Sequence, residues 1–328
     1  MRTPSCAAAK FACAAASVLL LALPVARPAC AQGTAAAPAA PVARLDIGET
    51  RTLEILPLVD WNVARPGLRG EAGVSYLVRT DRATILFDVG ANAGNDDPSP
   101  LLANMRELGV SLADVDTVVI SHAHLDHVGG PGFARAKTFS PGKVQTDLAG
   151  KRVFAPEPMK YPGLEPITVR APAVIAPGVA TIGPITGHLF IGPIAEQALA
   201  FSVQGKGIVL LVGCGHQGLA AVLERTRQLF DAPLVGIVGG LHYPVPHGRA
   251  IVAGIDTQRF AAWGPFGGLG AADVQREIGT LAGLGLQWVS LSPHDSSDET
   301  IEAFRKAFGD RYHDLRVGES QVIGAARQ

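Results

Sequence analysis

Residues 117–130 read Thr-Val-Val-Ile-Ser-His-Ala-His-Leu-Asp-His-Val-Gly-Gly and hold the densest group of potential metal ligands in the chain. His122, His124, Asp126 and His127 fall within six residues. They follow a β-branched apolar run that predicts a buried strand, and a glycine pair lets the chain turn away after them. Imidazole and carboxylate groups at one strand end can surround one or two small dications. The stretch therefore predicts a metal site.

The first thirty-one residues predict a cleaved secretory signal. Arg2 and Lys10 supply a positive n-region, residues 11–23 a short apolar core, and Ala29-Cys30-Ala31 a small-x-small cleavage site. The apolar core is shorter than the roughly twenty residues that a membrane span needs, and no later segment reaches that length. We therefore expect an exported protein, periplasmic or secreted, without a membrane span.

Cysteine usage agrees with export. Three of the four cysteines, including Cys30, lie in the predicted signal, so Cys214 would remain alone and no disulfide could form within the mature chain. Cys30 could instead be a lipoprotein cysteine, but Arg27 and Pro28 before it fit that alternative poorly. Cys214 is either a small buried residue behind the metals or a thiolate ligand. We favour the buried role because oxidation of an exported ligand thiol would threaten activity.

Charge and composition exclude some classes of partner. Without Arg2, Lys10 and Arg27 the chain keeps 25 basic residues against 29 acidic ones. This balance indicates neither a nucleic-acid nor an anionic-membrane partner, so we expect a small-molecule substrate. Residues 32–44 predict a disordered Ala/Pro tether, which leaves residues 45–328 as one domain with a sizeable core.

Strand and helix patterns alternate along that domain. Strands are predicted at residues 52–59, 73–79, 83–87, 116–121, 167–169, 198–203, 207–212, 234–238 and 287–291. Helices are predicted at residues 100–108, 219–229, 272–284 and 299–308. Residues 131–180 predict no other firm element, and residues 243–270 predict a long glycine-rich loop. Two β-rich stretches, each followed by helices, favour an α/β protein in which two sheets pack together with helices outside.

Three further histidines stand where apolar strands end in small residues: His216, His242 and His294. If the strands are aligned as consecutive units, these ends meet at one edge of the fold. His188, in Thr186-Gly-His, is a weaker candidate ligand. His247 and His313 are expected at the surface.

The loop at residues 243–270 is expected to cover the pocket. Its candidate substrate contacts are Arg249, Arg259 and Trp263, together with Phe266. Two arginines would suit an anionic substrate group, although solvated loop arginines are the commoner case.

These motifs resemble the metallo-β-lactamase fold superfamily of metal-dependent hydrolases. The resemblance rests on Leu86-Phe-Asp-Val-Gly90, the His-x-His-x-Asp-His of residues 122–127 and the later strand-end histidines, and covers about residues 52–324. Within the superfamily the chain is most similar to the 7,8-dihydropterin-6-methyl-4-(β-ribofuranosyl)aminobenzene-5′-phosphate synthase-like branch. That likeness rests on Leu58-Val-Asp-Trp-Asn62, Glu71-Ala-Gly-Val-Ser75, Gly213-Cys-Gly-His216, Gly239-Gly-Leu-His242 and Pro293-His294.

The resemblance implies a four-layer αββα sandwich with a binuclear site at the sheet edge. His122, His124 and His216 would bind the first metal, and Asp126, His127 and His294 the second. Asp88 would orient the His loop from behind the metals, and His242 would be an added ligand or a substrate contact. The aspartate that usually bridges the metals is replaced by Gly213-Cys-Gly-His216, so the bridging ligand and two-metal occupancy stay open.

The donor set suits one or two zinc ions, with iron or manganese as alternatives. Zinc lowers the pKa of a bound water to about 7 and so provides a metal-bound hydroxide at neutral pH. Asp126 could both ligate and accept a proton from the nucleophile. No Gly-x-Ser-x-Gly or phosphate-loop pattern offers another catalyst.

The sequence therefore predicts an exported metal-dependent hydrolase acting on a small-molecule ester, lactone, amide or phosphoester. One alternative is a dihydropterin-type transferase or synthase, as the branch name suggests, although export argues against it because pterin phosphates are cytoplasmic. The other is a non-catalytic metal- or ligand-binding protein, whose site would have no open coordination position.

Overall fold

The computed structural model describes residues 43–265 and 267–324. The predicted signal peptide, the tether as far as residue 42, and Phe266 lie outside these residues. Arg44, the last residue of the predicted tether, donates hydrogen bonds to the carbonyl oxygens of Arg227 (2.5 Å) and Phe230 (2.7 Å). The folded domain thus includes this end of the tether.

Two β-sheets form the centre of the domain, in the strand orders β17-β1-β2-β3-β4-β5-β6 and β16-β13-β12-β11-β8-β7. The first sheet contains β1 (Thr52–Val59), β2 (Ser75–Thr80), β3 (Thr84–Phe87), β4 (Thr117–Val119), β5 (Arg152–Ala155), β6 (Ile167–Thr168) and β17 (Gln321–Gly324). The second contains β7 (Ala173–Ala176), β8 (Val179–Thr181), β11 (Leu199–Val203), β12 (Gly207–Val212), β13 (Leu234–Gly239) and β16 (Trp288–Leu291). Two-stranded ribbons are formed by β9 (Ile185–Leu189) with β10 (Gly192–Glu196) and by β14 (Ile251–Val252) with β15 (Ile255–Asp256).

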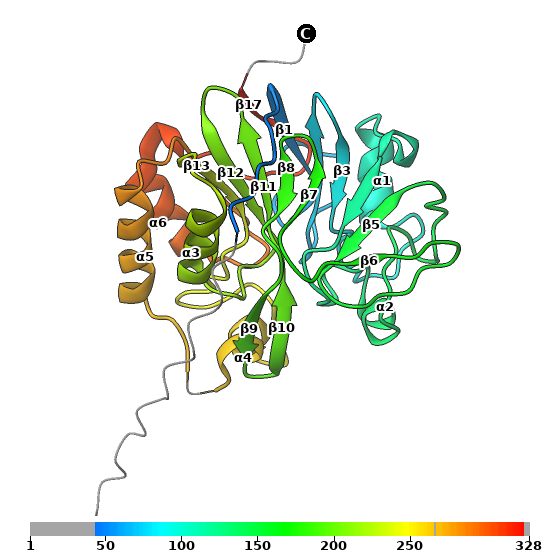
Figure 1. Cartoon of the computed structure of the whole chain (residues 1–328). Coiled ribbons are helices and arrows are strands. Elements are labelled where there is room, and N and C mark those ends of the chain that lie inside the picture. Colours follow the sequence, from blue (N-terminus) through cyan, green and yellow to red (C-terminus); the bar gives the residue numbers. More distant parts are fainter. Residues whose placement is uncertain (1–42, 266, 325–328) are drawn as a thin grey trace, which may run out of the picture. The chain divides into compact units, whose positions relative to one another are not determined.

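Helices cover the outer faces of the two sheets. They are α1 (Pro100–Glu107), α2 (Pro131–Arg135), α3 (Leu219–Leu229), α5 (Ala271–Gly283) and α6 (Asp298–Phe308), with short 3-10 turns at Leu112–Asp114 and Gly309–Arg311. A further helix, α4 (Thr257–Trp263), packs against β9 instead. Figure 1 shows α3, α5 and α6 beside the second sheet, and α1 and α2 on the side of the first. The layer order helix, sheet, sheet, helix confirms the predicted αββα sandwich.

Strand periodicity explains this layering. In β12 the side chains of Ile208, Leu210 and Val212 pack into the core beneath α3, α5 and α6. The alternate residues Val209 and Leu211 pack between the two sheets. Successive side chains of a strand point to opposite faces, so one apolar run fills two cores. Burial of these apolar faces is the main favourable contribution to folding.

The strand directions bring the site loops to one edge. β3, β4 and β5 are parallel to one another, as are β12, β13 and β16. β1 runs in the same direction as β3, because both are antiparallel to β2. The loops that follow β1, β3, β4, β12, β13 and β16 therefore all leave from carboxyl ends, where α/β folds place binding groups.

Several predicted elements are confirmed. The bounds of β1, β12 and α3 are as predicted, and Ser99 caps α1 by accepting the N–H of Leu102 (3.2 Å). The ends of the other predicted helices and strands agree to within two residues.

Two segments contain elements that were not predicted from the sequence, and the prediction of a continuous loop at residues 243–270 is wrong. Residues 131–180 also form α2, β5, β7 and β8. Of these, β5 and β8 are held by pairing with the more distant strands β4 and β11, which a local pattern does not reveal. Residues 243–270 form β14, β15 and α4, and Asp256 caps α4 by accepting the N–H of Arg259 (3.1 Å). Flanking glycines concealed this short helix.

No helix in the described residues combines the length and apolarity that crossing a bilayer requires.

Replacing Leu211 tests the inter-sheet core. Its side chain is fully buried between the sheets. We expect Leu211→Ala to lower the free energy of unfolding, measured in urea, by about 2–5 kcal/mol through the lost burial and the cavity left behind. Leu284→Ala at a 41% exposed position is the control and should change it by less than about 0.5 kcal/mol. Equal losses in the two variants would contradict this packing.

Candidate metal centre

Three imidazoles form the first group of donors. His122 Nε2 lies 3.1 Å from His124 Nδ1, which lies 3.1 Å from His216 Nε2. The three nitrogen atoms lie within 4.8 Å of one another. His122 and His124 come from the loop after β4, and His216 comes from the loop after β12 in the other sheet. The sheets thus bring the three predicted ligands of one metal together.

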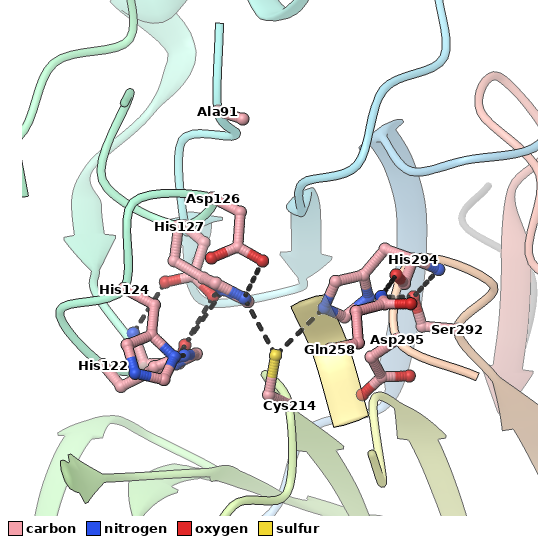
Figure 2. Close-up of polar contacts among 12 residues, drawn as sticks. Ala91, His122, His124, Asp126, His127, Cys214, Gln258, Ser292, His294 and Asp295 are labelled. Atoms are coloured by element: carbon pink, nitrogen blue, oxygen red, sulfur yellow. Dashed lines mark hydrogen bonds and ion pairs between the residues drawn. The ribbon is translucent and has the colours of Figure 1, made fainter. Parts of the chain in front are cut away.

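A second group lies beside the first. It contains Asp126, His127, Cys214 and His294. The Sγ atom of Cys214 is 3.1 Å from His127 Nε2 and 3.0 Å from His294 Nε2, while Asp126 Oδ2 is 3.7 Å from His127 Nε2. Figure 2 shows the sulfur between these two imidazoles. The three residues predicted to bind the second metal therefore meet around a cysteine.

Cys214 has a more central position than expected. It is buried, as predicted, with 3% of its surface exposed. Its sulfur does not lie behind the cluster, however: it belongs to the second group and also to a third, with His216 and His242. Burial raises the pKa of the thiol well above its usual value. The thiol occupies the place in the sequence where the resemblance implied a bridging aspartate.

Burial keeps most of these histidines neutral. It lowers the pKa of His122, His216 and His294 well below the usual value, and it lowers the pKa of His242 to about 4. A neutral imidazole keeps a lone pair that can bind a metal. The rings lie against one another instead of against water. Each neutral ring therefore keeps one unprotonated nitrogen that can face the shared site.

His127 is the exception. Burial acts to lower its pKa, but the carboxylates of Asp126 and Asp88 outweigh it and raise the pKa to about 9. Its proton supplies the positive charge that the two acids favour. A dication at the same place would supply that charge instead, so a metal and the proton compete for this ring.

Asp88 supports the His loop, as predicted. It accepts hydrogen bonds from the backbone N–H (2.6 Å) and Oγ–H (2.7 Å) of Ser121, and its Oδ2 lies 2.8 Å from His127 Nδ1. Ser121 Oγ is in turn 2.9 Å from His122 Nδ1. One buried carboxylate thus fixes the orientation of two rings, and such contacts behind ligands tune metal binding.

Asp60 gives His294 the same kind of support from the other sheet. It accepts hydrogen bonds from Tyr76 Oη and Ser292 Oγ, both at 2.7 Å, and Ser292 Oγ lies 2.6 Å from His294 Nδ1. Burial raises the pKa of Asp60 to about 6. Sequence reasoning assigned Asp60 no role, although its position directly after a buried strand was a usable signal.

Glu196 holds the cysteine loop. Its carboxylate accepts the backbone N–H groups of Cys214, Gly215 and His216, each at 2.8 Å. Burial raises the pKa of Glu196 to about 7, while the three N–H donors favour its charged form. This residue was missed because it lies at the end of β10, in no motif. Glu196 reaches the site only because β10 pairs with β9 and the surrounding fold places this hairpin there.

His242 is held in a left-handed backbone conformation, with φ 54°. Its N–H donates to Asp295 Oδ2 (2.9 Å), and its Nε2 lies 3.3 Å from the carbonyl oxygen of Gln258. Gln258 also donates a side-chain hydrogen bond to the His294 carbonyl oxygen. Asp295 was missed, although its place next to His294 could have drawn attention to it.

Glycines let the loops come this close. A Cβ atom at Gly213 would overlap Ser121 Oγ, and one at Gly240 would overlap the Gly213 carbonyl oxygen. The Gly-Cys-Gly-His and Gly-Gly-Leu-His motifs therefore need glycine so that loops from neighbouring strands can touch.

Several weaker candidates lie away from the cluster. His188 is exposed in β9, and its neighbour Gly187 is the residue that lies against the backbone of His216. His247 is exposed, as expected. His313 is only half-buried and stacks on Trp288 with ring centroids 3.5 Å apart.

The predicted substrate contacts of the 243–270 loop contact other parts of the protein, and the Trp263 ring centroid lies 5.8 Å from that of His242. The guanidinium of Arg249 pairs with Asp298 (2.6 Å). Arg259 donates to the carbonyl oxygen of Pro244 (3.1 Å) and lies over the Trp263 ring. None of Arg249, Arg259 and Trp263 is among the residues that line the cavity beside the metal ligands, so their contact with a substrate stays a prediction.

A cavity of about 280 Å³ opens onto the donors. Most of the candidate ligands line it: His124, Asp126, Cys214, His216, His242 and His294. The loop does cover this cavity, as expected, but through Ala250, Thr257, Gln258 and Ala261. Such a volume lies at the low end for small-molecule sites.

The arrangement fits a metal centre of one or two ions. The donor atoms converge from both sheets, and the rings are neutral through burial. The buried Nδ1 atoms of His216 and His242 have no hydrogen-bond partner. Unsatisfied polar atoms buried at one place call for an explanation, and metal ligation supplies one for a cluster of this composition.

Comparison with known proteins agrees with this geometry. Residues 68–226, which contain His122 and His216 but not His242 or His294, match the family model described as the metallo-beta-lactamase superfamily. The chain is 22% identical over 240 residues to the 7,8-dihydropterin-6-methyl-4-(beta-D-ribofuranosyl)-aminobenzene-5′-phosphate synthase of Methanocaldococcus jannaschii, an alignment that covers 60% of this chain and 80% of that protein.

Among solved structures, Tm1679, described as a metal-dependent hydrolase of the beta-lactamase superfamily, superposes with a TM-score of 0.57 and 19% identity. The match covers 83% of this chain and all of Tm1679, and at this identity it shows a common fold. The family match thus identifies a metallo-β-lactamase superfamily domain at residues 68–226, and the fold shared with Tm1679 agrees with it.

Proposed function

We propose that the protein is a metal-dependent hydrolase acting on a small-molecule ester, lactone, amide or phosphoester. The convergence of neutral histidines from two sheets on one open cavity carries this proposal. Catalytic metal sites keep a position free for substrate or water, and here the cavity reaches both donor groups. The same opening argues against a purely structural or storage role.

The ligand assignments follow from the two groups. His122, His124 and His216 would hold one dication, and Asp126, His127 and His294 the other, with Cys214 between them. The imidazole and thiolate donors favour zinc over manganese. A bound dication would supply Lewis acidity, which activates water and polarises the scissile carbonyl or phosphoryl group.

The chain's own residues would orient the site and accept protons. The side chain of Asp126 is 28% exposed and lines the cavity, so its free oxygen can accept a proton from the nucleophile. Asp88 and Asp60 keep the His127 and His294 rings in place. Thr257 and Gln258 also line the cavity, and their side chains hold the loop in place by donating to the carbonyl oxygens of Ala250 and His294.

The curated relative favours a second candidate, a synthase acting on a dihydropterin compound. Incubation of the metal-loaded protein with dihydropterin and phosphoribosyl compounds tests it, and the absence of any new product would remove it. We further propose that residues 1–31 direct export to the periplasm or medium. Fractionation of expressing cells checks this, and a cytoplasmic, uncleaved protein would contradict it.

Removal of one imidazole should prevent the first donor group from binding its metal. We expect the purified protein to carry one or two equivalents of zinc by elemental analysis, and His124→Ala to lose metal and at least a hundredfold in turnover of responsive esters or phosphodiesters. His188→Ala is the matched control, since His188 is exposed in β9, and it should keep both properties. A fully active, metal-loaded His124→Ala variant would sink the proposal.

Cobalt substitution tests Cys214 as a ligand. A thiolate bound to cobalt(II) gives a near-ultraviolet charge-transfer absorption that imidazole and carboxylate ligands do not give. We expect this absorption in the cobalt-loaded protein, its loss in Cys214→Ser, and its retention in His188→Ala. If the cobalt-loaded wild-type protein lacked the absorption, Cys214 would not be a metal ligand but only a buried residue.

Glu196→Gln tests the support of the cysteine loop. The amide of this variant would have one oxygen and one NH₂ group in place of the two carboxylate oxygens. The NH₂ group cannot accept the backbone N–H groups that Glu196 now accepts. We expect metal affinity to fall about 10- to 100-fold with an unchanged circular dichroism spectrum. Glu224→Gln on the exposed face of α3 should leave affinity unchanged. Equal affinities for the two variants would show that Glu196 does not position the loop.

A further inference from the structure

We propose that the non-reacting part of the substrate is an uncharged, apolar group, such as a short acyl, alkyl or aryl chain, and carries no phosphate. This inference rests on the proposed site and specifies what occupies the cavity beside it.

Five apolar side chains line the cavity beside the metal ligands. They belong to Ala72, Leu125, Ile191, Ala250 and Ala261. Three of these five side chains are methyl groups, which leave open space where longer side chains would fill the cavity. Binding an apolar group there removes apolar surface from water on both sides.

No lysine or arginine side chain lines the cavity within the described part of the chain. Its charged lining residues are the acids Asp126 and Asp295. The nearby guanidiniums of Arg249 and Arg259 are already bound to Asp298 and to the Pro244 carbonyl oxygen. A phosphate remote from the metals would thus lose hydration without gaining a cation, which is costly.

The apolar lining continues outward at the mouth. Leu125, Phe190, Ile191 and Phe260 are each between 40% and 59% exposed. Phe190 and Phe260 contact each other edge to face, with ring centroids 5.3 Å apart. Exposed large apolar side chains are ordinary when scattered, but several around one cavity mark a binding site.

Two elements build this mouth together. The hairpin of β9 and β10 lies beside α4, away from the two main sheets (Figure 1). The N–H of Phe190 donates to the Ala262 carbonyl oxygen (2.9 Å), and the N–H of Ile191 donates to that of Ala261 (3.3 Å). These backbone hydrogen bonds place Ile191 and Ala261 on adjoining walls of the cavity. The apolar surface is therefore fixed by the backbone of the domain.

Alkyl hydroxamic acids test the inference by binding alone. The zinc-loaded full chain is titrated calorimetrically with the series from acetohydroxamic to octanohydroxamic acid, in which the metal-binding head is constant. We expect the Kd to fall up to about fourfold per methylene until the cavity is filled. Ile191→Glu should abolish this dependence on length without changing zinc content. Ile167→Glu, an exposed isoleucine in β6, is the matched control and should keep it.

Three outcomes separate this inference from the proposed function. If the Kd does not depend on chain length, or if a hydroxamate ending in phosphate binds more tightly than the apolar one of equal length, the inference is overturned. If affinity rises with length but no aryl ester of any acyl length is turned over, the inference holds and the hydrolase assignment fails. If the inference and the hydrolase assignment both hold, kcat/KM for the esters should rise with acyl length by the same factor per methylene as the hydroxamate affinity.

Discussion

The mutual burial of imidazole rings at the shared edge of two sheets is the constraint on which the site depends. His122 and His124 from one sheet meet His216 from the other without solvent between their nitrogen atoms. Burial holds the pKa values of these rings low, so their lone pairs converge unprotonated. A dication placed among these nitrogen atoms would accept their lone pairs, which suits the cluster to metal binding. The metal site is therefore a consequence of how the sheets pack.

Four buried carboxylates make this packing possible. Asp88 and Asp60 hold rings of the two sheets through Ser121 and Ser292, while Glu196 and Asp295 hold the backbones of the loops that carry His216 and His242. Burial raises the pKa of each acid, and each is compensated by donors from the segment it supports. Rigid support of this kind keeps ligands oriented before a metal binds.

The sequence predicted the sandwich and its principal histidines because those signals are local. The apolar run before His122 and the strand-like run before His216 each identify a strand end without reference to the rest of the chain. Glu196 could not be found this way, since its three partners lie about twenty residues later. For the arginines of the 243–270 loop, charge alone does not reveal that Asp298 already binds Arg249. Cys214 was identified as buried, but only the approach of His127 and His294 places its sulfur at the centre.

Anomalous diffraction from a zinc-loaded crystal, measured on both sides of the zinc absorption edge, tests the central claim most directly. The account predicts a peak within coordination distance of the His122, His124 and His216 nitrogen atoms, and any second peak between Asp126, His127 and His294 beside Cys214. A crystal grown with excess zinc that shows no peak in this cluster, or shows zinc bound only elsewhere, would contradict it.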